Sequence, residues 1–93
     1  MNKKKLNKAR KKIDQIDKKI LNLIKKRTQV VNYMLTHKIY KKQIIDHKRI
    51  NKILKKIKIL SVKKGVDPKI TSKIWNSMIW GFVDYQKRNF KKK

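Results

Sequence analysis

The fold of this chain is decided by the stretch from Leu6 to Lys38, LNKARKKIDQIDKKILNLIKKRTQVVNYMLTHK, which contains neither Gly nor Pro. Its apolar side chains recur at alternating spacings of three and four residues, as in a helix that buries one stripe. We therefore predict one amphipathic helix over about residues 6–39, with a cation, Arg27, inside its apolar stripe. The other members of the stripe are Leu6, Ala9, Ile13, Ile16, Ile20, Leu23, Val30 and Met34.

This helix is too long for a compact monomer. At about 1.5 Å per residue it extends over roughly 50 Å, whereas a compact chain of about 100 residues has a radius of gyration near 13 Å. We interpret the 93 residues of the chain as a single domain, 1–93. The residues outside this helix are too few to cover its apolar stripe. A second copy can cover it. The sequence therefore predicts an all-α fold assembled as an intertwined homodimer.

A second, shorter helix is predicted over about residues 46–64. Residues 40–45 have lost the apolar stripe and are expected to form a connecting loop. Asp46 is placed to cap the helix that follows, since an Asp side chain accepts hydrogen bonds from the first backbone N–H groups. Gly65 is expected to end it in the left-handed conformation.

A third helix is predicted over about residues 68–88. Asp67 can cap it, and Pro68 suits its first turn because the backbone N–H that proline lacks would be unpaired there. Its apolar face should end at Gln86, a polar residue at the next position of the stripe. That face consists of Ile74, Trp75, Met78, Ile79, Phe82 and Val83.

The formal net charge of +25 first suggests nucleic-acid binding. However, the lysines lie on the polar faces of all the predicted helices and do not gather on one face, and the aromatic residues fall on or beside an apolar face. We therefore expect a solvated surface and no specific nucleic-acid partner. The absence of Cys fits a reducing compartment, and no apolar run reaches the length of a membrane span. We expect a cytoplasmic protein that does not bind a membrane.

Arginine is rare among the 30 cationic residues, so we expect each Arg to have a function that Lys cannot replace. The planar guanidinium grips a carboxylate with two parallel hydrogen bonds, which Lys cannot do. Arg27 and Lys38 are eleven residues apart, about three helical turns, and so share one face. Arg49 stands at the start of the second helix and Gln86 at the end of the third. We therefore predict that all four side chains face one internal cavity, which would bind a small dianion.

The chain offers little for other chemistry. It has no Glu and no Cys, and His37 and His47 form no ligand pattern, so we expect neither a metal nor a cofactor. Catalysis would then depend on positioning and electrostatics, without a nucleophile or a general base.

The order and spacing of the polar residues resemble the all-helical chorismate mutase family. The resemblance implies a dimer of three-helix chains with two equivalent sites, each binding a small dianionic substrate. It is carried by Leu6-x-x-x-Arg10-x-x-Ile13-Asp14-x-Ile16-Asp17, Arg27, Lys38, Asp46-x-x-Arg49, Val66-Asp67-Pro68 and Gln86.

The resemblance also implies roles for these residues. Arg10 and Arg27 would bind the two carboxylates, Lys38 and Gln86 the ether oxygen, while Asp46 and Arg49 belong to the substrate-binding positions. Arg10 would enter the site of the partner subunit. The seventeen residues from Arg10 to Arg27 correspond to roughly 26 Å of helix, too far for one small substrate.

Two positions favour one branch of that family. Ile50 stands where typical mutases have the Glu that binds the ring hydroxyl of chorismate, and Phe82 lies one turn before Gln86. Both features are similar to the isochorismate pyruvate-lyase branch, which converts isochorismate to salicylate and pyruvate. We favour this branch, with weak chorismate mutase activity as a second activity. Against it, Phe82 lacks the hydroxyl that this branch usually has. The alternatives are a chorismate mutase of aromatic amino-acid biosynthesis, forming prephenate, and a non-enzymatic basic helical dimer that binds nucleic acid.

Overall fold

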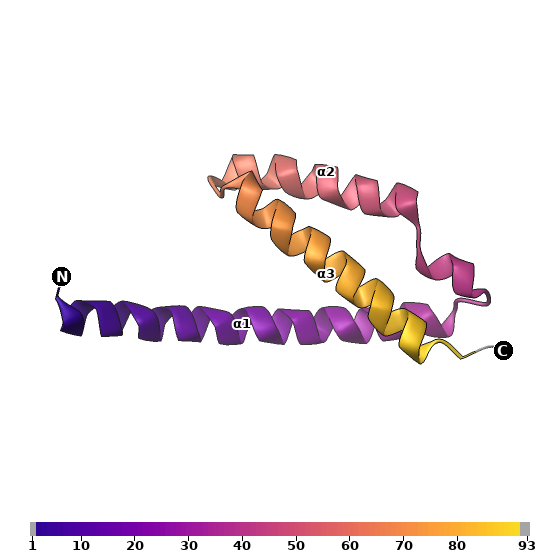
Figure 1. The fold of residues 1–93 in the computed structure, drawn as a ribbon, viewed down its shortest axis with the longest axis horizontal. Helices are drawn as coiled ribbons and strands as arrows, with labels where there is room; N and C mark the ends of the chain where they lie inside the picture. Colours follow the sequence, from indigo (N-terminus) through magenta and orange to yellow (C-terminus); the bar gives the residue numbers. More distant parts are fainter. Residues whose placement is uncertain (1, 92–93) are drawn as a thin grey trace. The chain divides into compact units, whose positions relative to one another are not determined.

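The computed structural model describes residues 2–91, and over these residues the chain is all-helical, as predicted (Figure 1). The chain divides into two units between Val31 and Asn32, and each unit is described by itself below. The elements are α1 (Lys3–Thr36), a 3-10 helix η1 (Lys41–Ile44), α2 (His47–Lys64) and α3 (Pro68–Asn89).

The N-terminal unit consists of the greater part of α1. The side-chain oxygen of Asn2 caps the helix by accepting from the backbone N–H groups of Lys4 and Lys5, at 3.0 and 3.2 Å. Along this unit the predicted apolar stripe faces solvent in the single chain, with Ile16 54% and Leu23 63% exposed. Exposed apolar rows of this extent mark interaction surfaces.

The ends of α2 follow the predicted capping. The Asp46 carboxylate accepts a 3.0 Å hydrogen bond from the backbone N–H of Arg49. At the other end Gly65 has φ 73°, a left-handed conformation that places its N–H against the carbonyls of Ser61 and Val62. A residue with a Cβ would be strained at this φ, so the glycine fixes the point where the helix ends.

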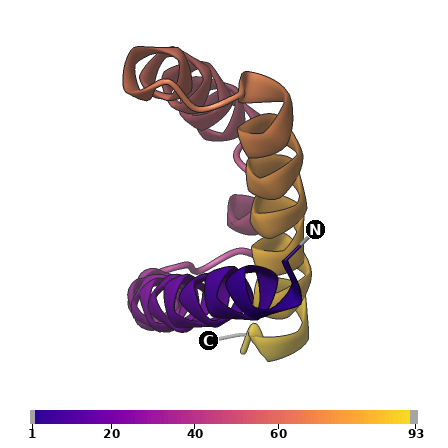
Figure 2. The same cartoon turned by 90° about the vertical axis from the view of Figure 1, so that its left-hand side faces the viewer.

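The start of α3 was also predicted correctly. The Asp67 carboxylate accepts a 2.9 Å hydrogen bond from the backbone N–H of Lys69, and Pro68 is the first helical residue. Because α2 ends at Lys64 and α3 begins at Pro68, a short turn joins the two helices, which contact each other and diverge away from the turn (Figures 1 and 2).

The core of the C-terminal unit lies between these helices and η1. Ile50 of α2, Ile79 and Val83 of α3 and Ile44 of η1 are buried. Ile74, predicted on the buried face of α3, is 51% exposed in the single chain.

The first helix ends earlier than predicted, at Thr36 and not near Ile39. The backbone N–H groups of His37 and Lys38 donate to carbonyls three residues back, at 3.0 and 3.1 Å, and this tighter turn breaks the α-helical ladder. Lys38 therefore lies two residues beyond the end of α1 and is not part of it.

The expected loop at residues 40–45 contains η1. The side-chain oxygen of Gln43 accepts from the backbone N–H groups of Ile39 and Tyr40, at 2.7 and 2.8 Å, and so closes the turn. Ile44 is only 4% exposed, and η1 packs on α3. A single turn of 3-10 helix buries one residue, too few to leave a stripe in the sequence.

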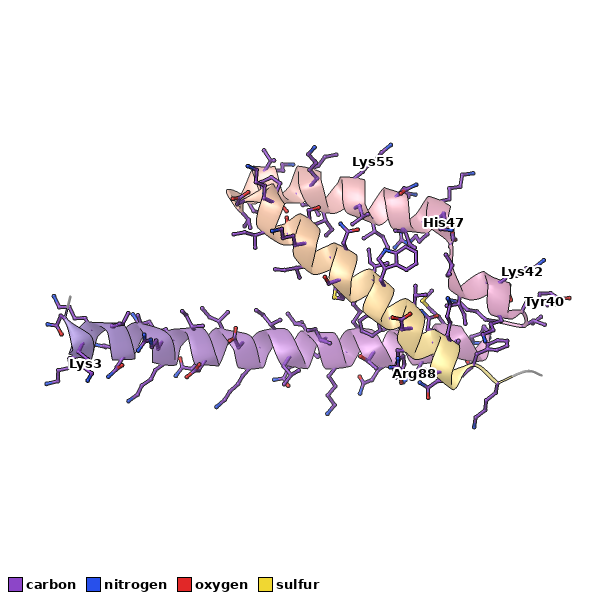
Figure 3. The ribbon with its side chains drawn as sticks, viewed as in Figure 1. Lys3, Tyr40, Lys42, His47, Lys55 and Arg88 are labelled. Atoms are coloured by element: carbon purple, nitrogen blue, oxygen red, sulfur yellow. The ribbon has the colours of Figure 1, made fainter. Side chains whose placement is uncertain are left out.

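The outer surface of this unit carries lysine ammonium groups. Lys55 of α2 is exposed, and the Nζ atom of Lys42 in η1 lies 5.4 Å from the ring centroid of Tyr40 (Figure 3). None of the helices within residues 2–91 combines the length and the apolar character needed to cross a membrane.

Candidate active site

Lys38 and Gln86 meet within the C-terminal unit. The Nζ atom of Lys38 donates a 2.7 Å hydrogen bond to Oε1 of Gln86, across 48 positions of the sequence. Gln86 lies in the last turns of α3 and is only 7% exposed, while Lys38 is half-buried. Two polar groups predicted to face one cavity are thus in direct contact.

The amide of Gln86 is oriented by a second hydrogen bond. Its Nε2 donates to the backbone carbonyl of Phe82, one turn earlier on α3, at 3.3 Å. An ammonium has three N–H groups and a primary amide has two, so each residue has donor capacity beyond these bonds. The pair can therefore place two donors on one ligand oxygen.

Burial lowers the pKa of the Lys38 ammonium, because the partly desolvated charged form is less stable than in water. The negative charge of Asp46 acts in the opposite direction and raises this pKa. Asp46 thus has two functions: it caps α2 and it helps to keep Lys38 charged. Such a partly desolvated cation interacts more strongly with a developing negative charge than a solvated lysine does.

Apolar side chains on α2 and α3 belong to the same unit as the polar pair. Ile50, in the first turn of α2, is 9% exposed and contributes no hydrogen-bonding group. Phe82 is half-buried and packs edge-on against Tyr85, with ring centroids 6.4 Å apart. The polar pair therefore belongs to a unit whose interior is otherwise mostly hydrocarbon.

Over residues 9–87 the chain matches the family model of chorismate mutase type II. The chain belongs to the chorismate mutase type II family. Comparison with curated proteins and with solved structures gave no match. Membership relates the chain to pericyclic, chorismate-related enzymes, which act on a small anionic substrate, and the matched range includes every predicted site residue from Arg10 to Gln86.

The predicted arginines of this chorismate mutase family chain lie on two helices. Arg10 is exposed and Arg27 is half-exposed, both on α1 in the N-terminal unit. Arg49 is exposed in the first turn of α2, where its backbone N–H is bonded to Asp46.

A groove of about 580 Å³ lies elsewhere, between the middle of α2 and the first turns of α3. None of the predicted site residues lines it, so we do not place the chorismate-related chemistry there. Its walls are Leu54, Lys55, Ile57, Lys58, Pro68, Lys69, Ser72 and Lys73.

No three His or Asp side chains within residues 2–91 gather closely enough to hold a metal ion.

One further contact, near Lys38 and Gln86, was missed by the sequence interpretation. The hydroxyl of Tyr85, the residue before Gln86, donates a 2.8 Å hydrogen bond to Oδ1 of Asn32. Asn32 does interrupt the apolar character of Val30 and Val31, and that interruption is a signal that could have drawn attention to it.

Proposed function

We propose that this chorismate mutase family protein is an isochorismate pyruvate lyase, which converts isochorismate to salicylate and pyruvate. In that reaction the ether bond between the ring and the enolpyruvyl group breaks, and one ring hydrogen moves to the enolpyruvyl methylene. The methylene becomes the methyl group of pyruvate and the ring becomes aromatic, so no water, oxidant or cofactor is consumed.

Support for ether cleavage comes from the contact between Lys38 and Gln86. As the ether bond breaks, negative charge grows on its oxygen, and donors already aimed at that oxygen stabilise the transition state more than the substrate. The 2.7 Å hydrogen bond holds the Lys38 ammonium beside the Gln86 amide before any substrate binds. In this proposal the two side chains meet the ether oxygen from two sides.

The two carboxylates of the substrate would be bound by arginines. Arg27 supplies one planar guanidinium, and Arg10 of the partner subunit supplies the other, as the family resemblance implies. Arg49 would help to close the pocket. The exposed apolar stripe of α1 supports this proposed homodimer, because a second copy would remove it from water.

The lyase assignment is carried by one observation, the apolar side chain at Ile50. This residue is 9% exposed and cannot accept a hydrogen bond from the ring hydroxyl of chorismate. The mutase alternative, which forms prephenate, is favoured by Phe82, whose side chain lacks the hydroxyl usual in the lyase branch. Both reactions break the same ether bond and would use the same donors.

Product analysis tests this proposal. Purified protein is incubated separately with isochorismate and with chorismate, and salicylate, pyruvate and prephenate are quantified by chromatography. The lyase proposal predicts equal amounts of salicylate and pyruvate from isochorismate, at a higher kcat/KM than for prephenate from chorismate. Prephenate as the main product would support the mutase instead, and no product from either substrate would refute both.

A further inference from the structure

Two side-chain hydrogen bonds join the last turns of α3 to the end of α1. Tyr85 donates to Asn32 at 2.8 Å, and Lys38, two residues beyond α1, donates to Gln86 at 2.7 Å. All four residues belong to the C-terminal unit. On α3 the two bonds start from consecutive residues, and at the other end their partners are six positions apart.

We propose that Tyr85 and Asn32 form a positioning pair that holds the Gln86 amide against the Lys38 ammonium. The inference rests on the proposed function, because it assigns these residues an effect on the same ether-cleaving donors. Neither residue is expected to touch the substrate.

The geometry explains why a second bond is needed. Consecutive side chains leave an α-helix about 100° apart. The buried Ile79 and Val83 hold α3 against α2 and η1, and the bond between Gln86 and Lys38 adds one anchor near its end. The bond at Tyr85 has a different direction and a different anchor, so it restricts the rotation that remains at the end of α3.

The ring of Tyr85 adds a second constraint. It packs edge-on against Phe82, whose backbone carbonyl accepts the Nε2 hydrogen bond of Gln86. The Tyr85 side chain is therefore linked to the Gln86 amide through Phe82, and Asn32 links it to the end of α1, six positions before Lys38.

The pair should affect geometry more than stability. Asn32 is exposed, and the bond between Tyr85 and Asn32 is accessible to water. Hydrogen bonds that exchange with water contribute little net stability. A small displacement of a donor, in contrast, reduces turnover strongly, because reacting groups must be aligned in the transition state.

The direct test replaces Tyr85 by Phe, which removes only the hydroxyl. We expect kcat to fall about tenfold, while KM changes by less than about twofold. Asn32→Leu should have the same effect, and the double variant should be no worse than either single variant, because both remove one bond. Asn32→Asp keeps an acceptor for the Tyr85 hydroxyl and should restore turnover.

Tyr33→Phe is the matched control. Tyr33 is the neighbour of Asn32 on α1, is exposed, and meets His37 through its ring. Loss of its hydroxyl should leave kcat unchanged. Thermal melts followed by circular dichroism check that all variants are folded. If Tyr85→Phe does not fold, the kcat of Asn32→Leu tests the positioning pair instead.

A second readout does not depend on turnover. Oε1 of Gln86 accepts from the charged ammonium of Lys38 and so favours its charged form. Asp46, the charged group whose field also raises that pKa, is unchanged in these variants. An NMR titration of the Lys38 side chain without substrate should therefore show a lower pKa in Tyr85→Phe than in the wild type.

These readouts separate the two proposals. If the wild-type protein is inactive on both substrates, the proposed function is refuted. The NMR titration of Lys38 is then the test of the positioning pair. If the Tyr85→Phe and Tyr33→Phe variants have the same kcat and the same Lys38 titration as the wild type, the positioning pair is refuted.

Discussion

The ammonium of Lys38 lies 2.7 Å from the side-chain oxygen of Gln86, although 48 positions separate them in the sequence. The contact orders a flexible lysine side chain in the free protein. Its rotamer entropy is then lost on folding and not on substrate binding. A donor that is already in place stabilises a transition state without reorganisation, as the proposed ether cleavage requires.

The charge of Asp46 should set the alkaline limit of activity. As pH rises, kcat should fall when the Lys38 ammonium loses its proton, and the lowered pKa places this loss below the ordinary range of lysine. Asp46→Asn removes the charge that raises this pKa, yet Asn caps a helix as well as Asp does. The alkaline limb of the kcat profile should therefore move to lower pH.

Asp67→Asn is the matched control for this measurement. Asp67 caps α3 as Asp46 caps α2, but it is not among the causes of the Lys38 pKa shift. Equal displacement of the alkaline limb in both variants would refute the specific coupling of Asp46 to Lys38.

Arg27→Lys should weaken substrate binding. The charge remains, but a lysine cannot form two parallel hydrogen bonds with one carboxylate. We expect KM to rise about tenfold, and kcat to fall as well because the substrate is held less rigidly. Steady-state kinetics compare this variant with Arg88→Lys, at an exposed position in the last turn of α3. Indistinguishable kinetics of the two variants would remove Arg27 from the site.

Ile50→Glu tests the branch of the family. In a lyase, the introduced carboxylate occupies an apolar position and should lower the kcat/KM for isochorismate. In a mutase, it supplies an acceptor for the ring hydroxyl and should raise the kcat/KM for chorismate. Ile50→Leu, which keeps the position apolar, separates the effect of the carboxylate from that of altered packing. An increase for chorismate with no loss for isochorismate would contradict the lyase assignment.

The exposed stripe of α1 should be required for assembly. Ile16→Asp places a charge in the stripe, and because burying apolar surface contributes about 25 cal/mol per Å², the proposed dimer should dissociate and lose activity. Ile59→Asp is the control, because Ile59 is also exposed but lies on α2 outside the predicted stripe. Sedimentation equilibrium measures both variants. A folded, active wild-type monomer at micromolar concentration would refute the dimer and the role of Arg10 in it.

Local signals in the sequence predicted much of the fold. Asp46, Gly65 and Asp67 define helix ends through bonds to residues within four positions, so the sequence was sufficient to place them. The early end of α1 at Thr36 and the turn η1 were missed. Both depend on bonds three residues apart and on the packing of Ile44, which leave no periodic pattern.

The candidate site was predictable only in part. Lys38 was noticed because it shares a face with Arg27, and Gln86 because it is polar at the next position of the apolar stripe of α3. Their direct contact was not predicted and comes from the structure. Asn32 gives only a weak signal, because it follows Val30 and Val31, and Tyr85 gives none, since Tyr is common on helix surfaces. Their hydrogen bond depends on how α3 is rotated against the end of α1, and periodicity does not determine that rotation.

The turnover of Lys38→Ala tests the central claim most directly. Removing one donor from a site that stabilises growing negative charge costs about 3 to 4 kcal/mol, or roughly a hundred- to a thousand-fold in kcat. Lys42→Ala, at an exposed lysine of η1, controls for the loss of one positive charge. The assay uses isochorismate or chorismate, whichever the wild type converts faster. We predict that kcat falls at least about a hundredfold in Lys38→Ala and stays near the wild-type value in Lys42→Ala. Full activity of Lys38→Ala would contradict the assignment of this site.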